Sequence, residues 1–150
     1  TVNTASEFLD EGLVLYSVDG DGDRIDYDVN SGGLALDIPM VVLVNQFSAS
    51  ASEVLSGALQ DHERAVIIGT STFGKGSVTN LWPLNDGSGV NFTTARWFTP
   101  NGSLIEGEGL TPDVVLDPVD EDEDEDIQLD RAIEILKEQL EEGTSARSNR

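Results

Sequence analysis

Two short apolar runs separated by an amphipathic stretch place the strongest constraint on how this chain folds. Residues 41–44 and 65–69 have the length and the β-branched content of buried strands, and residues 51–61 between them follow a helical pattern. Two strands that are joined through a helix pair in parallel. The loops that follow both strands, 45–50 and 70–76, are therefore expected at the same, carboxyl-terminal edge of one sheet.

The flanking sequence predicts helices and hairpins around this unit. A turn at 19–23 and the run Asn85-Asp86-Gly87-Ser88-Gly89 are typical of β-hairpins. The last helix is amphipathic, with Leu129, Ala132, Ile133, Leu136 and Leu140 expected to face inward. The expected elements are helices over 2–9, 51–61 and 127–140 and strands over 13–18, 24–29, 40–45, 65–69, 78–82, 90–99 and 112–116. The pattern indicates an α/β fold with a mixed sheet, β-hairpins and a C-terminal amphipathic helix.

The 150 residues are enough for one domain with a buried core. We interpret 1–116 as one core, 117–126 as an acidic loop, 127–142 as a helix that packs on the core, and 143–150 as a tail. The chain does not begin with Met and opens on a helical pattern. We therefore expect it to be a piece of a longer protein.

Composition narrows the function classes. The net charge of −21 disfavours nucleic-acid binding, which requires a basic face. Cysteine is absent, so disulfides and thiol chemistry are excluded, and no apolar run is long enough for a membrane span. Asp19, Asp21 and Asp23 alternate as in a calcium loop, but Arg24 and Asn30 replace its required glycine and glutamate. We predict a plain turn there, no metal and no cofactor.

The two loops at the predicted sheet edge carry residues suited to covalent catalysis. Ser48, Ser50 and Ser52 lie in the strand-to-helix turn, and composition alone does not choose between them as a nucleophile. A serine nucleophile needs a base. His62 ends the predicted helix, about 16 Å from its start at 1.5 Å per residue, which is too far for proton transfer. Lys75 in the second loop is the better candidate.

A lysine acts as a base only where its surroundings favour the neutral amine, as a low-dielectric pocket does. We expect Phe73 to supply apolar cover and the flanking glycines to permit a tight backbone path. Glu53, three residues after Ser50, fits a capping box. The helix start also offers backbone N–H groups to a developing oxyanion.

Together these segments resemble the tail-specific, or carboxyl-terminal processing, serine proteases. The resemblance rests on Ser48-Ala49-Ser50-Ala51-Ser52-Glu53 and Thr72-Phe73-Gly74-Lys75-Gly76, and it extends in order over residues 1–140. It implies the crotonase/Clp-protease-like spiral α/β core, of which this chain would be the C-terminal part. It also implies a serine endopeptidase with a Ser50/Lys75 dyad, in which the N–H of Ala51 is one oxyanion donor.

The family also implies partners and a location. Its substrates are polypeptides with apolar C-termini, commonly delivered by a PDZ domain that adds the tail as a strand. That domain and an upstream glycine-rich motif, which supplies the second oxyanion donor, are expected in a missing N-terminal part. The isolated chain is therefore expected to be weakly active or inactive, and the surface it exposes favours self-association. The family mostly works outside the cytoplasm, in the periplasm or cell envelope.

One position departs from the family pattern and keeps other functions open. Thr79 stands where the family usually has a glutamine that orients the lysine, and a threonine reaches less far. The main alternative is a non-proteolytic ligand- or peptide-binding module of the same fold, as in the retinoid-carrier repeats of the eye. A scaffold or oligomerisation domain is a third interpretation. A carrier would need neither Ser50 nor Lys75, so their presence favours the enzyme.

Overall fold

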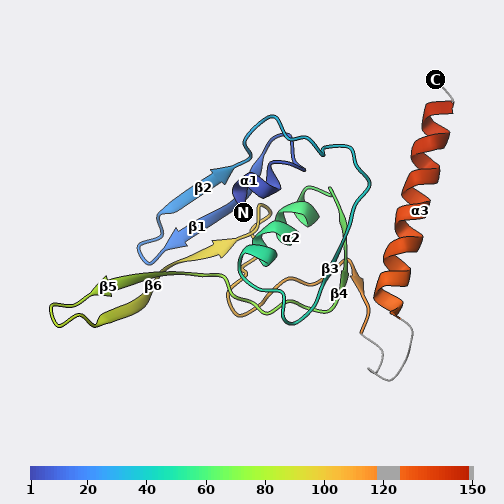
Figure 1. The fold of residues 1–150 in the computed structure, drawn as a ribbon. Coiled ribbons are helices and arrows are strands. Elements are labelled where there is room, and N and C mark those ends of the chain that lie inside the picture. The colour runs from blue at the N-terminus through green and yellow to red at the C-terminus, as the bar shows by residue number, and fades with distance from the viewer. Residues whose placement is uncertain (118–125, 149–150) are drawn as a thin grey trace.

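The computed structural model describes residues 1–117 and 126–148, which form two small sheets with helices packed against them (Figure 1). In chain order the elements are α1 (Val2–Ala5), β1 (Leu13–Asp19), β2 (Arg24–Asp28), β3 (Val41–Val44), α2 (Ala51–Asp61), β4 (Val66–Gly69), β5 (Ser77–Pro83), β6 (Gly89–Phe98), β7 (Val114–Val115) and α3 (Ile127–Ser148). This mixed α/β arrangement confirms the fold class expected from the sequence.

The predicted strand–helix–strand unit is present as a parallel sheet in the order β3-β4-β7. Val41 pairs with Val66 and Val44 with Gly69, so the two strands end together. Helix α2 connects them and buries one side in the core, where Leu59 and Ile67 are almost completely shielded from solvent. Because β3 and β4 stop in register, the loops that follow them leave the sheet side by side.

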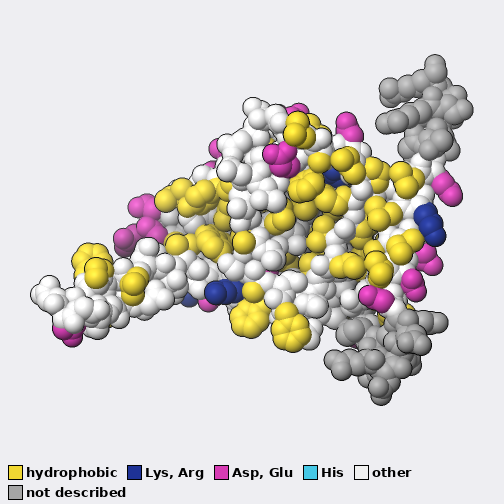
Figure 2. Space-filling model, viewed as in Figure 1, with side chains coloured by type: hydrophobic (Ala, Val, Ile, Leu, Met, Phe, Trp, Pro, Cys, Tyr) yellow, Lys and Arg dark blue, Asp and Glu magenta, His cyan; other side chains and the backbone are white. Residues whose placement is uncertain are grey.

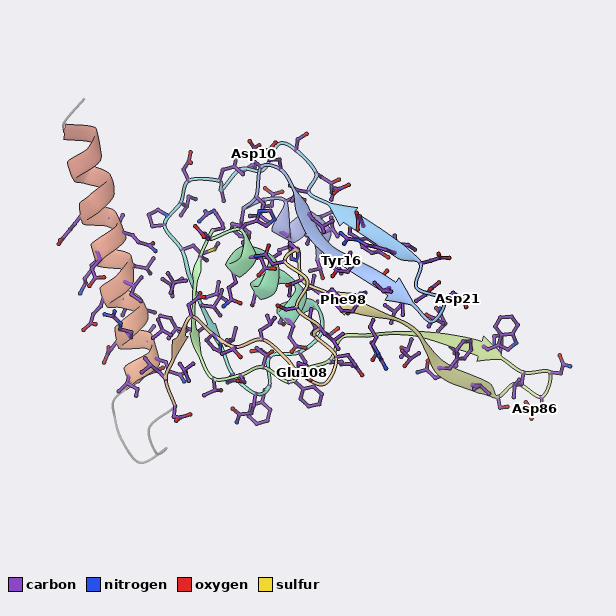
Figure 3. All side chains as sticks on the ribbon, turned by 180° about the vertical axis from the view of Figure 1, so that it is seen from behind. Asp10, Tyr16, Asp21, Asp86, Phe98 and Glu108 are labelled. Carbon is purple, nitrogen blue, oxygen red and sulfur yellow. The ribbon has the colours of Figure 1, made fainter. Side chains whose placement is uncertain are left out.

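The second sheet is antiparallel, in the order β2-β1-β6-β5. Tyr16 of β1 and Phe98 of β6, both labelled in Figure 3, are paired neighbours in this sheet. Their rings stack with centroids 5.0 Å apart. The hairpin of β5 and β6 extends well beyond the body of the molecule (Figure 1). Figure 2 shows hydrophobic side chains on its outer part, where Leu81 and Trp82 are 70% and 65% exposed.

The helix α1 is shorter than predicted, ending at Ala5 rather than Leu9. After it the carbonyls turn toward other segments instead of continuing the helix. The Glu7 carbonyl accepts from the N–H of Ala35 (2.9 Å), and the Phe8 carbonyl accepts from Nε of Arg64 (3.0 Å). Tertiary hydrogen bonds here outweigh the local helical pattern.

The helix α3 differs from the prediction in both length and face. It continues to Ser148, whereas we expected a helix to 142 followed by a tail. It packs on β3 and β4 through Ala132 and Ile135, which are buried, whereas Leu129, Ile133 and Leu140 are largely exposed. The helix therefore presents a face rotated from the predicted one. Most of the predicted acidic loop, residues 118–125, lies outside the described residues.

No helix in residues 1–117 and 126–148 has the length and apolar character needed to cross a membrane. The same described part of the chain holds no group of three or more histidine, aspartate or glutamate side chains arranged to bind a metal ion.

Candidate active site

Ser50 occupies a strained backbone conformation at the start of α2. It is the N-cap residue, with φ 58° and ψ −116°, a region that non-glycine residues rarely adopt. Such strain costs about 1–3 kcal/mol and is found preferentially at functional sites. The neighbouring serines have other roles: the Ser48 hydroxyl accepts from the N–H of Asn45 (3.1 Å), and Ser52 lies exposed within the helix. Backbone geometry therefore singles out Ser50, which composition could not.

Glu53 is the buried centre of the site. Its side chain is fully shielded from solvent, at the third position of α2, and it forms the predicted capping box with Ser50. Its Oε2 accepts from the N–H groups of Ser50 and Lys75, each at 2.8 Å. Its Oε1 accepts from the Thr72 hydroxyl (2.5 Å) and the Gly74 N–H (2.6 Å). One carboxylate thus joins the helix start to the lysine loop.

This carboxylate brings the two candidate catalytic residues together. Because the backbone nitrogens of Ser50 and Lys75 each lie 2.8 Å from the same oxygen, they are at most twice that distance apart. The N–H of Phe73 also donates to the Ser48 carbonyl (3.0 Å) and closes a second link between the loops. The meeting of the two loops at one sheet edge, expected from the strand pattern, is confirmed.

The surroundings of the Lys75 side chain differ from the expectation. We predicted a low-dielectric pocket covered by Phe73, but Lys75 is exposed and Phe73 is 65% exposed. Within the described part of the chain, the Lys75 ammonium has no hydrogen-bond or ion-pair partner. The glycines on both sides of it pack closely against the backbone of residues 105–109.

Thr79, the predicted lysine-orienting residue, lies exposed on β5 and makes no hydrogen bond with Lys75. His62 is the C-cap residue of α2, as predicted, and its Nε2 lies 2.8 Å from the carbonyl oxygen of Leu13. Its ring therefore binds the start of β1 rather than the serine. Neither side chain makes a hydrogen bond with Ser50 or Lys75 in the described residues.

An apolar pocket opens beside the start of α2. It has a volume of about 230 Å³ and is lined by Thr1, Val2, Leu15, Tyr27, Ala51, Val54, Val78 and Trp97. Ala51 follows Ser50 directly, so the pocket begins next to the candidate nucleophile. The N–H of Ala51 is the first of the helix and donates to no group in residues 1–117 and 126–148. Both features are available to a bound peptide.

Sequence reasoning missed several residues that hold the lysine loop in place. Glu53 was expected only as a cap, and Thr72 was not considered. The Thr72 hydroxyl donates to Glu53 and accepts from the N–H of Leu110 (2.8 Å). The Glu106 carboxylate accepts from the N–H of Gly76 (2.7 Å). These contacts join positions 19 to 38 residues apart, so no local pattern could have revealed them.

The strain at Ser50 predicts that Ser50→Gly will raise the free energy of unfolding of this chain by about 1 kcal/mol relative to Ser50→Ala. Both substitutions remove the hydroxyl, but only glycine adopts φ 58° without steric cost. Urea unfolding of the two variants measures the difference. Equal stabilities would show that the backbone conformation at Ser50 is not strained.

Solved structures with this fold place the chain among the peptidases. The photosystem II D1 C-terminal processing protease superposes with a TM-score of 0.74 at 46% identity, over 77% of this chain and 30% of that one. A putative peptidase from Parabacteroides merdae superposes with a TM-score of 0.73 at 23% identity, over 90% and 46% of the two chains, which supports the fold alone.

The chain belongs to peptidase family S41, whose model matches residues 1–116. The carboxy-terminal-processing protease of Bartonella bacilliformis is 44% identical over 118 residues, which are 77% of this chain and 27% of that protein. The chloroplastic C-terminal processing peptidase of Tetradesmus obliquus is 46% identical over 117 residues, 78% of this chain and 25% of that protein. The chain thus spans about a quarter of the length of these relatives.

Proposed function

We propose that this chain forms part of the catalytic core of a serine endopeptidase that processes the carboxyl termini of proteins. In this mechanism Ser50 Oγ attacks the scissile carbonyl carbon while Lys75 Nζ takes its proton. The tetrahedral intermediate collapses, the leaving amine takes the proton from the lysine, and an acyl-enzyme forms. Water then attacks the ester carbonyl carbon while Lys75 Nζ takes the water proton. The bond between the acyl carbon and Ser50 Oγ breaks, Oγ takes the proton back from the lysine, and the acid product leaves. The observation that carries the proposal is the single Glu53 oxygen bound by the N–H groups of both Ser50 and Lys75.

The start of α2 supports oxyanion stabilisation. The N–H of Ala51 has no acceptor in the described residues and lies at the positive end of the helix dipole. A donor fixed in advance at the site where negative charge develops stabilises the transition state more than the substrate. Ala51 is therefore the proposed donor, and a second donor comes from the part of the parent protein upstream of this chain.

The apolar pocket beside Ser50 supports a preference for apolar side chains near the cleaved bond. Val54, Val78 and Trp97 contribute apolar side chains, and no Asp, Glu, Lys, Arg or His side chain is among the lining residues, so a charged substrate side chain would lose its hydration there without a side chain of opposite charge to pair with. The names of the relatives point to carboxyl-terminal processing. Together these observations favour polypeptides with apolar C-termini as substrates.

Because Lys75 is exposed in this chain, catalysis is expected to require the longer parent protein. An amine in water stays protonated at neutral pH, so a lysine base needs cover that removes water. The described residues leave Lys75 exposed, and the relatives are about three times as long as this chain. We infer that the N-terminal core, a PDZ domain or the bound substrate supplies this cover. The extracytoplasmic location and the homo-oligomer stay predictions.

The test is cleavage of an unfolded protein with an apolar C-terminus by the full-length parent, its Ser50→Ala variant and this chain alone. We expect the parent to cleave, the variant to lose at least about 1,000-fold in kcat/KM, and the isolated chain to be weak or inactive. A matched substrate ending in Asp-Asp should be cut more slowly. A parent that cleaves neither substrate would favour the non-proteolytic binding module instead.

A further inference from the structure

The loop between β6 and β7 packs directly against the lysine loop. Glu108, labelled in Figure 3, marks this loop. Two of the hydrogen bonds in this contact involve the residues on either side of Lys75: the Gly76 N–H donates to Glu106 Oε2 (2.7 Å), and the Gly107 N–H donates to the Gly74 carbonyl (2.9 Å). The two residues that flank Lys75 are therefore both held by this loop.

The contact is too tight for the loops to slide. A Cβ atom added at Gly76 would lie 2.4 Å from the backbone nitrogen of Glu106, a distance that requires the backbone to move. Ile105, which directly precedes Glu106, is fully buried and anchors the loop in the hydrophobic core. The Glu106 side chain is half-buried, and its carboxylate is thus held at a fixed place beside Gly76.

Three consecutive backbone N–H groups in the lysine loop donate to carboxylates. Gly74 and Lys75 donate to Glu53, and Gly76 donates to Glu106. Hydrogen bonds to charged acceptors are about twice as strong as neutral ones. Glu53 fixes the loop on the side that faces α2. On the side that leads into β5, the Gly76 carbonyl accepts from the Trp97 N–H (2.7 Å), and Glu106 is the side chain that binds the Gly76 N–H. The direction in which the Lys75 side chain leaves the backbone therefore depends on both carboxylates.

We propose that Glu106 is a positioning residue for Lys75, acting through its hydrogen bond to the Gly76 N–H. This inference rests on the proposed Ser50/Lys75 protease. Glu106 takes no proton in the reaction and touches no substrate. It holds the backbone of the lysine loop so that the amine approaches the Ser50 hydroxyl correctly. Thr79 stands where the related proteases usually have a glutamine that orients the lysine, and it makes no hydrogen bond with Lys75. Another side chain must therefore help to position the lysine.

The kinetic test compares three variants of the full-length parent. Glu106→Ala removes the acceptor and should lower kcat about 10- to 100-fold with KM unchanged, because a small misplacement of a catalytic group has effects of this size. Glu106→Gln keeps an oxygen acceptor and should retain kcat within about threefold, since backbone hydrogen bonding and not charge is required. The matched control is Glu108→Ala, which should behave as wild type. Glu108 is an exposed residue of the same loop, and its carboxylate makes no hydrogen bond within residues 1–117 and 126–148.

Hydrogen–deuterium exchange of the segment 74–77 in the same proteins tests the contact without relying on activity. Glu106→Ala should raise exchange at the Gly76 amide at least about tenfold, and Glu106→Gln and Glu108→Ala should not. Faster exchange with unchanged kcat would overturn the positioning role, and so would a Gln variant as impaired as the Ala variant. Unchanged exchange in Glu106→Ala would overturn the contact itself. If wild-type parent cleaves nothing, the proposed function fails, and exchange alone still decides whether Glu106 holds the loop.

Discussion

Replacing Lys75 by arginine is expected to lower kcat/KM of the full-length parent by about 1,000-fold or more, although the positive charge is kept. A guanidinium stays protonated at every pH at which the protein is folded, so it cannot accept the proton of the Ser50 hydroxyl. General-base catalysis contributes about 10²- to 10⁴-fold, and a mispositioned arginine adds steric cost. Steady-state cleavage of a peptide with an apolar C-terminus measures the effect.

The position of Lys75 makes this substitution easy to interpret. The side chain is exposed and has no partner in the described residues, so Lys75→Arg should change the free energy of unfolding by less than about 0.5 kcal/mol. Lys137→Arg, on an exposed position of α3, is the matched control and should leave both activity and stability unchanged. An arginine variant of Lys75 with near-normal turnover would eliminate the lysine-base mechanism and leave Ser50 without its proposed partner.

The sequence was sufficient for features that depend on local pattern. The runs at 41–44 and 65–69 and the helix at 51–61 were predicted to within one residue, because a buried strand and an amphipathic helix each have a characteristic period. Both hairpins followed from their turn residues. Parallel pairing then required the loops that carry Ser50 and Lys75 to meet, which the contacts of Glu53 confirm.

Features that depend on distant contacts were missed. The buried face of α3 was predicted only in part: Ala132 is buried as expected, but Ile135 was not expected, because apolar residues surround much of the helix and only packing on β3 and β4 selects among them. The close approach of Gly74 and Gly76 to the loop after β6 is a second such feature. The two glycines indicate that the backbone of the lysine loop packs closely against another segment, but they do not identify that segment.

Replacing Glu53 by alanine is expected to have the second large effect, a loss of about 3–5 kcal/mol in the free energy of unfolding together with loss of cleavage. The carboxylate accepts four hydrogen bonds in a site closed to solvent, from Ser50, Thr72, Gly74 and Lys75. Its removal leaves these donors without an acceptor, and each unsatisfied buried donor costs about 1–3 kcal/mol unless the site relaxes. Urea unfolding of this chain measures the loss, and Glu63→Ala, at an exposed position after the same helix, is the control.

Glu53→Gln separates the number of acceptor oxygens from the shape of the side chain. A glutamine side chain has one oxygen and one NH₂ group, so it must place a donor against existing donors. The NH₂ group at the Oε2 position would face the N–H groups of both Ser50 and Lys75, which cannot reverse. At the Oε1 position it would face only the Gly74 N–H and the Thr72 hydroxyl, and the hydroxyl can rotate. The second orientation is therefore expected, with a loss of about 1–3 kcal/mol in the free energy of unfolding.

Because that orientation keeps the oxygen shared by Ser50 and Lys75, Glu53→Gln should retain measurable cleavage where Glu53→Ala does not. Equal activity in the two variants would contradict the role of Glu53 as the link between the nucleophile and the base.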